Sequence, residues 1–162
     1  MTEPATISQI GLVVRDLQKT METYTKMFGW GPWNVYEHKG PTLHDTHLHG
    51  KSEEYSMLCA EVMVGPICFE LIQPLTGKNI YSEWLEEHGE GFHHLAMMQH
   101  GVEESDKFKK MLLDAGGKMM MGGRIGETIE FYYVDTQPQL GVIVESGTGH
   151  AIDLKPIRTY PQ

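Results

Sequence analysis

The stretch His93-His94-Leu95-Ala96-Met97-Met98 decides the fold, because it repeats a pattern first met at Ser8-Gln9-Ile10-Gly11-Leu12-Val13-Val14-Arg15-Asp16. Each stretch is a short apolar strand with a polar residue inside it, and each is followed by apolar residues at helical spacing. Gln9 and His94 occupy matching places in the two stretches. Because a repeated order of elements constrains a fold more strongly than any single motif, we expect two similar halves.

Each half also closes on a similar strand, in which one acidic residue lies within an apolar run. Phe69-Glu70-Leu71-Ile72 closes the first half and Ile143-Val144-Glu145-Ser146 closes the second. The coarse order of elements is βαβββ followed by βαβββ, so the predicted class is α+β, with two tandem modules whose curved mixed sheets surround a shared metal site. The expected layout is a single domain over residues 1–162, with module 1 at about 7–74, a linker helix at about 78–88, module 2 at about 91–146 and a tail at 147–162.

Four polar side chains stand where their apolar neighbours would otherwise predict core. A single polar residue in a strand usually faces solvent, but the coincidence of four in two matched halves favours convergence on one point. Three oxygen donors and one imidazole nitrogen suit a divalent ion such as Mn, Co, Ni, Zn or Mg, with room for water. The predicted metal ligands are Gln9, Glu70, His94 and Glu145.

Three segments carry a family resemblance: residues 69–74 (FELIQP), 88–96 (HGEGFHHLA) and 141–145 (GVIVE). With them the chain resembles the vicinal oxygen chelate superfamily, which includes glyoxalase I, methylmalonyl-CoA epimerase, extradiol dioxygenases and bleomycin-resistance proteins. The resemblance covers residues 7–146 and is greatest to the methylmalonyl-CoA epimerase branch. It implies one metal between two modules, one ligand from each of four strands, and a homodimer. By symmetry with Gln9, His94 is the expected ligand of the histidine pair, and His93 is expected on the other face of its strand.

Two departures from the epimerase branch indicate a different substrate for the same metal-dependent chemistry. Gln9 stands where the epimerases usually carry histidine, and instead resembles the glutamine of animal glyoxalase I. Residues 132–138 read YYVDTQP where the epimerases tend to have His-Pro-Lys. The resemblance therefore implies two substrate classes: an acyl-CoA like methylmalonyl-CoA, or a cyclic aryl ketone as in dihydrodaidzein racemase-like members.

The chemistry expected of this site is a metal-dependent epimerase or racemase reaction, in which a proton moves at a carbon next to a carbonyl. A metal with open positions stabilises the enolate, and acids on opposite faces of the carbon remove and return the proton. Glu145 is expected to leave the metal, or to bind it only loosely, and to act as the main base, whereas Glu70 is a ligand and candidate second acid. Weaker candidates for the second acid are Glu37, Glu53 and Glu54.

Two other functions stay open at this stage. The Gln/Glu/His/Glu set is also that of glyoxalase I, a lactoylglutathione lyase, and a bleomycin-resistance-like protein would bind a small molecule without catalysis. An extradiol dioxygenase is disfavoured, because its iron needs two histidines and one carboxylate.

Composition narrows the partners. The net charge of −9 argues against a broadly basic surface for nucleic acid or anionic membranes, so a small molecule is the expected substrate. Cys59 and Cys68 lie in apolar runs and are expected to be free thiols in a reducing compartment. The sequence shows neither a basic segment leading into an apolar run nor a membrane-spanning run, which predicts a cytoplasmic protein.

Two further groups are candidates for the rim of the substrate site. The first is a histidine cluster, which an irregular loop explains better than a second metal site does. The second is aromatic and would suit a flat or apolar substrate. The groups are His44, His47 and His49, and Trp33, Tyr36 and Tyr55.

Overall fold

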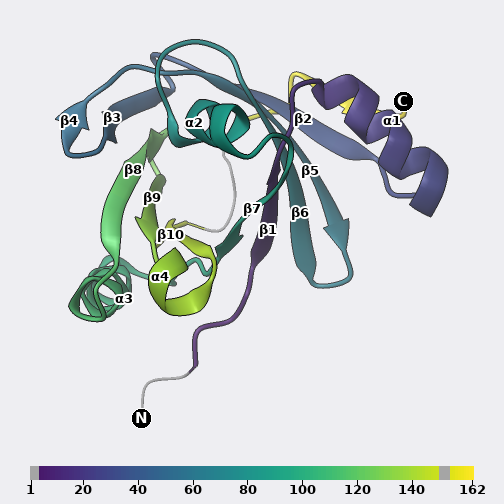
Figure 1. Ribbon diagram of the computed structural model, residues 1–162. Coiled ribbons are helices and arrows are strands. Elements are labelled where there is room, and N and C mark those ends of the chain that lie inside the picture. The colour runs from purple at the N-terminus through teal and green to yellow at the C-terminus, as the bar shows by residue number, and fades with distance from the viewer. Residues whose placement is uncertain (1–3, 150–153) are drawn as a thin grey trace.

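A single curved mixed sheet runs through residues 4–149 and 154–162, which are the residues that the computed structural model describes (Figure 1). The strands are β1 (Gln9–Val13), β2 (Trp33–His38), β3 (Leu43–Leu48), β4 (Lys51–Ser52), β5 (Met57–Val64), β6 (Ile67–Pro74), β7 (Gly91–Ala96), β8 (Lys118–Ile125), β9 (Ile129–Asp135), β10 (Ile143–Thr148) and β11 (Arg158–Tyr160). The helices are α1 (Leu17–Phe28), α2 (Ile80–Glu87), α3 (Val102–Asp114) and α4 (Gln137–Leu140).

The order of elements confirms the predicted α+β class. The second half runs β7, α3, β8, β9 and β10, with the short α4 between its last two strands. The first half runs β1, α1, β2, β5 and β6, and carries the extra pair β3 and β4 after β2. The repeated βαβββ pattern is therefore real, and the first copy contains an insertion.

The two halves meet at β1 and β7 in the middle of the sheet. The sheet order is β11-β2-β5-β6-β1-β7-β10-β9-β8-β3-β4, so each half places its first and last strands side by side. In both halves that pair is parallel, whereas β1 and β7 are antiparallel. Across this junction Gln9 pairs with Ala96 and Gly11 with His94. This reciprocal register brings the repeated polar positions of the two halves together.

The inserted pair differs from the irregular loop expected for the histidine cluster of His44, His47 and His49. β3 pairs antiparallel with β8, so the first half adds a strand to the outer edge of the second half. A register shift between His44 and His47, with Asp45 at φ 51°, interrupts the strand. Because a bulge breaks the alternation of apolar and polar residues, the pattern in the sequence did not indicate a strand.

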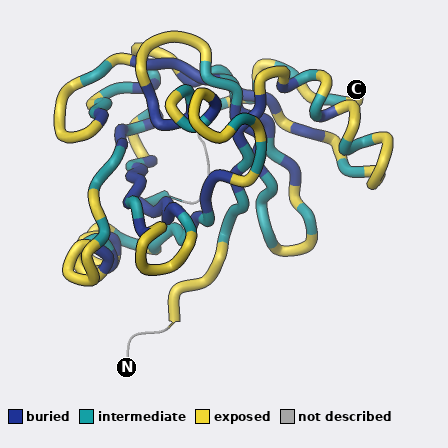
Figure 2. Tube along the Cα trace, in the orientation of Figure 1, coloured by how far each residue is buried: buried dark blue, intermediate teal, exposed yellow. Residues whose placement is uncertain are grey.

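The two faces of the first-half sheet bury different clusters. In β2, Trp33 and Val35 are buried beneath α1, with Leu17 and Met21 of that helix. Tyr36 and His38 alternate to the opposite, concave face. Figure 2 shows the burial concentrated on the central strands and the exposure in the outer loops. Trp33 is thus a core residue, and the expectation that it rims the substrate site was wrong.

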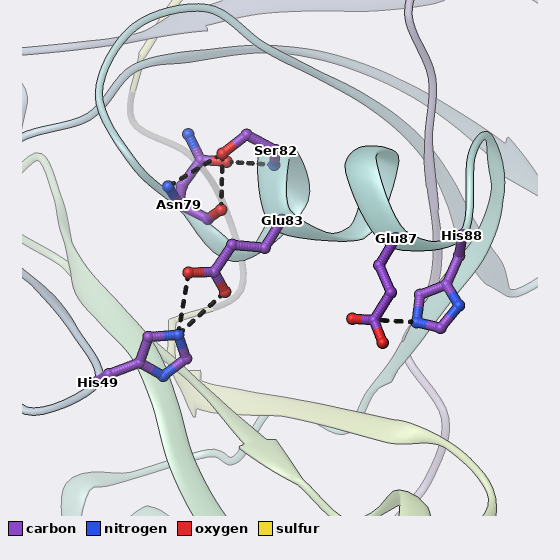
Figure 3. Close-up of polar contacts among 6 residues, drawn as sticks. All are labelled: His49, Asn79, Ser82, Glu83, Glu87 and His88. Atoms are coloured by element: carbon purple, nitrogen blue, oxygen red, sulfur yellow. Dashed lines mark hydrogen bonds and ion pairs between the residues drawn. The ribbon is translucent and has the colours of Figure 1, made fainter.

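Helix α2 closes one side of the concave face (Figures 1 and 3). A capping box starts it, because the Asn79 side chain accepts from the backbone N–H of Ser82 while the Ser82 hydroxyl lies 3.3 Å from the Asn79 backbone N. Its buried residues include Tyr81. On its outer side, Glu83 contacts His49 Nε2 at 2.9 Å, which connects α2 to the turn after β3.

The last strand returns to the first half. β11 pairs antiparallel with β2, with Arg158 opposite Val35. The predicted tail at 147–162 therefore begins inside β10 and ends on the sheet, and its residues 150–153 lie outside the described residues. Within the part of the chain that the structure describes, no helix is both long and apolar enough to cross a membrane.

Candidate metal centre and its cavity

Three strands from the middle of the sheet deliver a buried Glu–His–Glu group to the concave face. Glu70 comes from β6, His94 from β7 and Glu145 from β10, and one ligand atom of each lies within 4.8 Å of the other two. His94 Nε2 is 2.9 Å from Glu145 Oε2 and 3.8 Å from Glu70 Oε2. Three of the four predicted ligands are therefore brought together.

Unpartnered atoms in this group show that it fits a cation. His94 Nε2 and Glu145 Oε2 are buried and make no hydrogen bond of acceptable geometry, although they lie close together. Because buried polar atoms nearly always have partners, two unpaired ligand atoms in one place make a group that could hold a cation. Gln9 lines the adjoining cavity, and its place as the fourth ligand stays a prediction.

Gly11 leaves the space that the His94 ring fills. A Cβ atom at Gly11 would lie 2.0 Å from His94 Cε1, well inside van der Waals contact. Gly11 pairs with Glu70 on one side and with His94 on the other. A glycine inside an apolar strand often marks such a close approach, so the sequence did contain a signal for this residue.

His93 faces the same side as His94, so the prediction that it points to the other face was wrong. The register between β1 and β7 shifts at Gly11 and Leu12, and this bulge breaks the alternation at the histidine pair. His93 Nδ1 lies 2.9 Å from His94 Nδ1, and both rings are buried. Burial lowers the pKa of His93 well below its usual range, so its ring is neutral.

This contact fixes which nitrogen of His94 can bind a metal. For His94 to ligate a metal through Nε2, that nitrogen must be free of its proton, and the ring proton would then sit on Nδ1 and be donated to His93 Nδ1. His93 therefore holds the ring of His94 in one orientation and one tautomer. Partners of this kind commonly orient metal-binding histidines.

A third acid, Glu61, lies beside the group and was missed from the sequence. It stands on β5 directly opposite Glu70 and lines the cavity. Burial raises the pKa of Glu61 to about 7, and the nearby charge of Glu145 is the second cause of this rise. Burial also raises the pKa of Glu70 well above its usual range, and the charges of Glu145 and Glu61 add to this rise. A cation would relieve this repulsion. The available signal was an acid inside the apolar run of β5.

The concave face encloses a cavity of about 380 Å³ next to the group. Its lining is acidic, aromatic and apolar, and no lysine or arginine among the described residues contributes to it. Tyr81 of α2 donates to Tyr133 of β9 at 2.8 Å, and the Tyr133 ring packs edge-on against His94. Burial raises the pKa of both tyrosines, so both hydroxyls keep their protons. One of the two protons remains available to a ligand.

Other predicted site residues have different surroundings. Tyr36 lines the cavity as expected. Tyr55 is buried and donates its hydroxyl to the carbonyl of Gly122, and does not line this cavity. The three weaker acid candidates are also outside the cavity lining, so the structure does not support them as second acids. They are Glu37, Glu53 and Glu54.

The histidine cluster does not converge on one point. His44 Nε2 contacts the carbonyl of Gly126, whereas His49 contacts Glu83 on α2. His47 packs over the face of β8 at Gly122. The three side chains instead connect β3 to three different neighbours.

Cys59 and Cys68 are both free and line the cavity.

Fold and site together define a paired-module α+β protein with a buried Glu–His–Glu group suited to a divalent metal where the modules meet. Residues 8–133 match the glyoxalase/bleomycin resistance protein/dioxygenase superfamily, and the chain belongs to this family. No curated protein matches the sequence.

Solved structures of methylmalonyl-CoA epimerases share this fold. The Streptomyces coelicolor enzyme, in complex with 2-nitronate-propionyl-CoA, is 22% identical with a TM-score of 0.62, and the match covers 91% of this chain and 100% of that chain. The Mycobacterium tuberculosis enzyme is 19% identical with a TM-score of 0.58, and the match covers 93% of each chain. At these identities the likeness shows the shared fold.

Proposed function

We propose that this protein is a metal-dependent epimerase or racemase that moves a proton at a carbon next to a carbonyl group. The observation that carries the proposal is the placement of Glu70 and Glu145, which come from opposite halves and flank His94 over one cavity. Epimerisation needs two proton-transferring groups on opposite faces of one carbon. Two carboxylates delivered from two halves of a sheet meet that need.

Gln9, Glu70, His94 and Glu145 are the residues that would hold the divalent ion. When bound, such an ion would polarise the carbonyl oxygen and so acidify the neighbouring carbon. Glu145 would bind the ion only loosely or leave it, and its Oε2 is the proposed acceptor of that proton. Glu70 remains a ligand and candidate second acid, and Glu61, on the next strand, is the additional candidate that the structure supplies.

The surrounding residues keep the reacting groups in place. His93 orients His94 through the 2.9 Å contact between their Nδ1 atoms. The Tyr133 hydroxyl accepts a hydrogen bond from the Tyr81 hydroxyl, so its own proton can be donated to a substrate oxygen. The apolar lining excludes bulk water, which strengthens these interactions.

The lining favours a neutral ketone over an acyl-CoA as the substrate. Three acids and no described lysine or arginine line the cavity, so apart from the proposed ion no cationic group of the lining would pair with a substrate carboxylate. The volume of about 380 Å³ suits a small, flat molecule. A cyclic aryl ketone of the dihydrodaidzein type is the proposed class, and an acyl-CoA, as bound by the epimerases of like fold, is the competing class.

Deuterium incorporation at the α-carbon tests this function. The metal-loaded protein is incubated in D2O with a panel of aryl ketones and acyl-CoA thioesters, with and without a chelator. We expect exchange with at least one ketone, and its loss on chelation and recovery when metal is restored. Absence of exchange across the whole panel would overturn the proton-transfer function.

A glyoxalase I reaction is the second candidate, and the donor set of glutamine, glutamate, histidine and glutamate favours it. Formation of S-lactoylglutathione from methylglyoxal and glutathione would assign that activity instead. A bleomycin-resistance-like binding role is less consistent with the buried Glu–His–Glu group. The homodimer and the cytoplasmic location stay predictions, and sedimentation analysis tests the homodimer.

A further inference from the structure

We propose that the end of the cavity beneath β2 is a second polar subsite, in which His38 hydrogen-bonds a neutral hydroxyl group of the substrate. This inference deepens the proposed function, because it rests on the same cavity being the substrate site. It assigns a recognition role to a residue that is neither a metal ligand nor a neighbour of one.

The first observation is an unpartnered buried nitrogen. His38 is only 2% exposed and lines the cavity, yet its Nδ1 makes no hydrogen bond with any described residue. Buried side-chain atoms without a hydrogen bond also occur in His94 and Glu145, where the proposed metal accounts for them. The remaining one among the described residues belongs to His93, which does not line the cavity. Because buried polar groups are nearly always hydrogen-bonded, the Nδ1 of His38 indicates a ligand.

The second observation is the distance of this residue from the metal group. His38 of β2 pairs with Met57 of β5. Glu61 lies four residues further along β5 and pairs with Glu70 of β6. Four residues of strand span about 13 Å, and β2 lies two strands from β6, or about 10 Å across the sheet. A substrate that reaches both places is therefore elongated, with its reacting carbonyl at one end and a polar substituent at the other.

The third observation is the neutral chemistry of this end. Burial lowers the pKa of His38 to about 4, so at neutral pH the ring offers one N–H donor and one nitrogen acceptor. The Tyr36 ring is stacked at 6.0 Å and nearly parallel to it, and Met57 is its cross-strand neighbour. Within residues 4–149 and 154–162, no charged side chain is paired with His38. An anionic substituent would lack a counter-charge here, whereas a hydroxyl can both donate and accept.

A matched pair of aryl ketones tests the subsite. The two ketones differ only in one hydroxyl at the end of the molecule far from the carbonyl. Dissociation constants from titration calorimetry, and kcat and KM for α-deuterium exchange, are measured for the wild type, His38→Phe and His38→Gln. Tyr36→Phe is the matched control, because it removes a hydroxyl from the same strand face and keeps the stacked ring.

We expect the wild type to bind the hydroxylated ketone about 10- to 100-fold more tightly, the effect of one well-placed hydrogen bond. His38→Phe should reduce this preference to about twofold or less, and His38→Gln should retain part of it. Tyr36→Phe should keep the preference.

Three results would overturn the subsite: no preference in the wild type, equal weakening of both ketones by His38→Phe, or loss of the preference in Tyr36→Phe. Failure to bind either ketone would overturn it as well. The binding arm needs no turnover, so a hydroxyl preference without exchange would reject the proposed function and keep the subsite. Exchange without a hydroxyl preference would keep the proposed function and reject the subsite.

Discussion

Gly11 and His94 face each other across the junction of the two halves, and the imidazole of His94 occupies the space above Gly11 where a side chain would begin. The glycine has no strained backbone angle, so its role is the space it leaves. That space lets a histidine from the second half approach Glu70 of the first half, to 3.8 Å. The metal group therefore depends on a residue with no side chain.

Gly11→Ala should disrupt this group. Its Cβ would meet the His94 ring at 2.0 Å, so the ring must leave its place between the carboxylates. We expect metal affinity, measured by titration calorimetry, to fall by at least about tenfold, the lower end of what loss of ligand orientation costs. Ile10→Ala, on the other face of the same strand, is the control and should keep its metal affinity. Unchanged metal binding in Gly11→Ala would show that the ring can sit elsewhere.

His93→Phe should weaken metal binding without removing a ligand. The variant removes the acceptor for the Nδ1 proton of His94, so both the tautomer and the ring angle become free. We expect the dissociation constant for the metal to rise about 10- to 100-fold. His88→Phe, a change of the same kind at an exposed histidine, should have no such effect. Equal affinities in His93→Phe and the wild type would contradict the positioning role.

Glu61 should make the metal-free protein less stable as the pH rises. Folding raises the pKa of Glu61 from the ordinary 4.5 to about 7, so the folded state holds this proton more tightly than the unfolded state does. The contribution of Glu61 to the free energy of unfolding is therefore fully present below about pH 4.5 and is lost as the pH rises through about 7. Glu61→Gln should raise the Tm of the chelated protein more at pH 8 than at pH 5. Glu127→Gln, at an exposed position, is the control; an equal gain from Glu61→Gln at both pH values would refute the buried-acid assignment.

Tyr133→Phe should slow the proposed exchange. The variant removes the hydroxyl that can donate to a substrate oxygen, and loss of one such donor costs about 10²- to 10³-fold in kcat. Tyr81→Phe, which leaves the Tyr133 hydroxyl in place, should cost less. Both measurements use metal-loaded protein, with the metal content checked. A kcat for Tyr133→Phe equal to that of the wild type would remove this residue from the mechanism.

The sequence predicted the parts of the site that follow strand alternation. Glu70, His94 and Glu145 were found because each is a polar residue in a strand at a repeated place, and repetition is visible without a structure. His93 was placed on the wrong face because one bulge reverses alternation locally, and a bulge leaves little trace in composition.

The remaining differences came from contacts between distant segments. β3 pairs with β8, a strand of the other half, and nothing local in residues 43–48 specifies that partner. Glu61 is a single acid in the apolar strand β5, and His38 ends β2, where polar and apolar residues mix, so a solvated face explains either residue equally well. Only the curvature of the sheet turns their faces toward a cavity instead of toward solvent.

The central claim, one metal and a proton-accepting Glu145 above it, is tested most directly by Glu145→Gln. The substitution keeps the shape of the side chain and removes its basicity, while Gln9, Glu70 and His94 stay to hold the ion. The measurement pairs metal content with the rate of α-deuterium exchange for a ketone that the wild type turns over. The account predicts that metal is retained and exchange falls by about 10²- to 10⁴-fold. Full exchange with metal retained would contradict it.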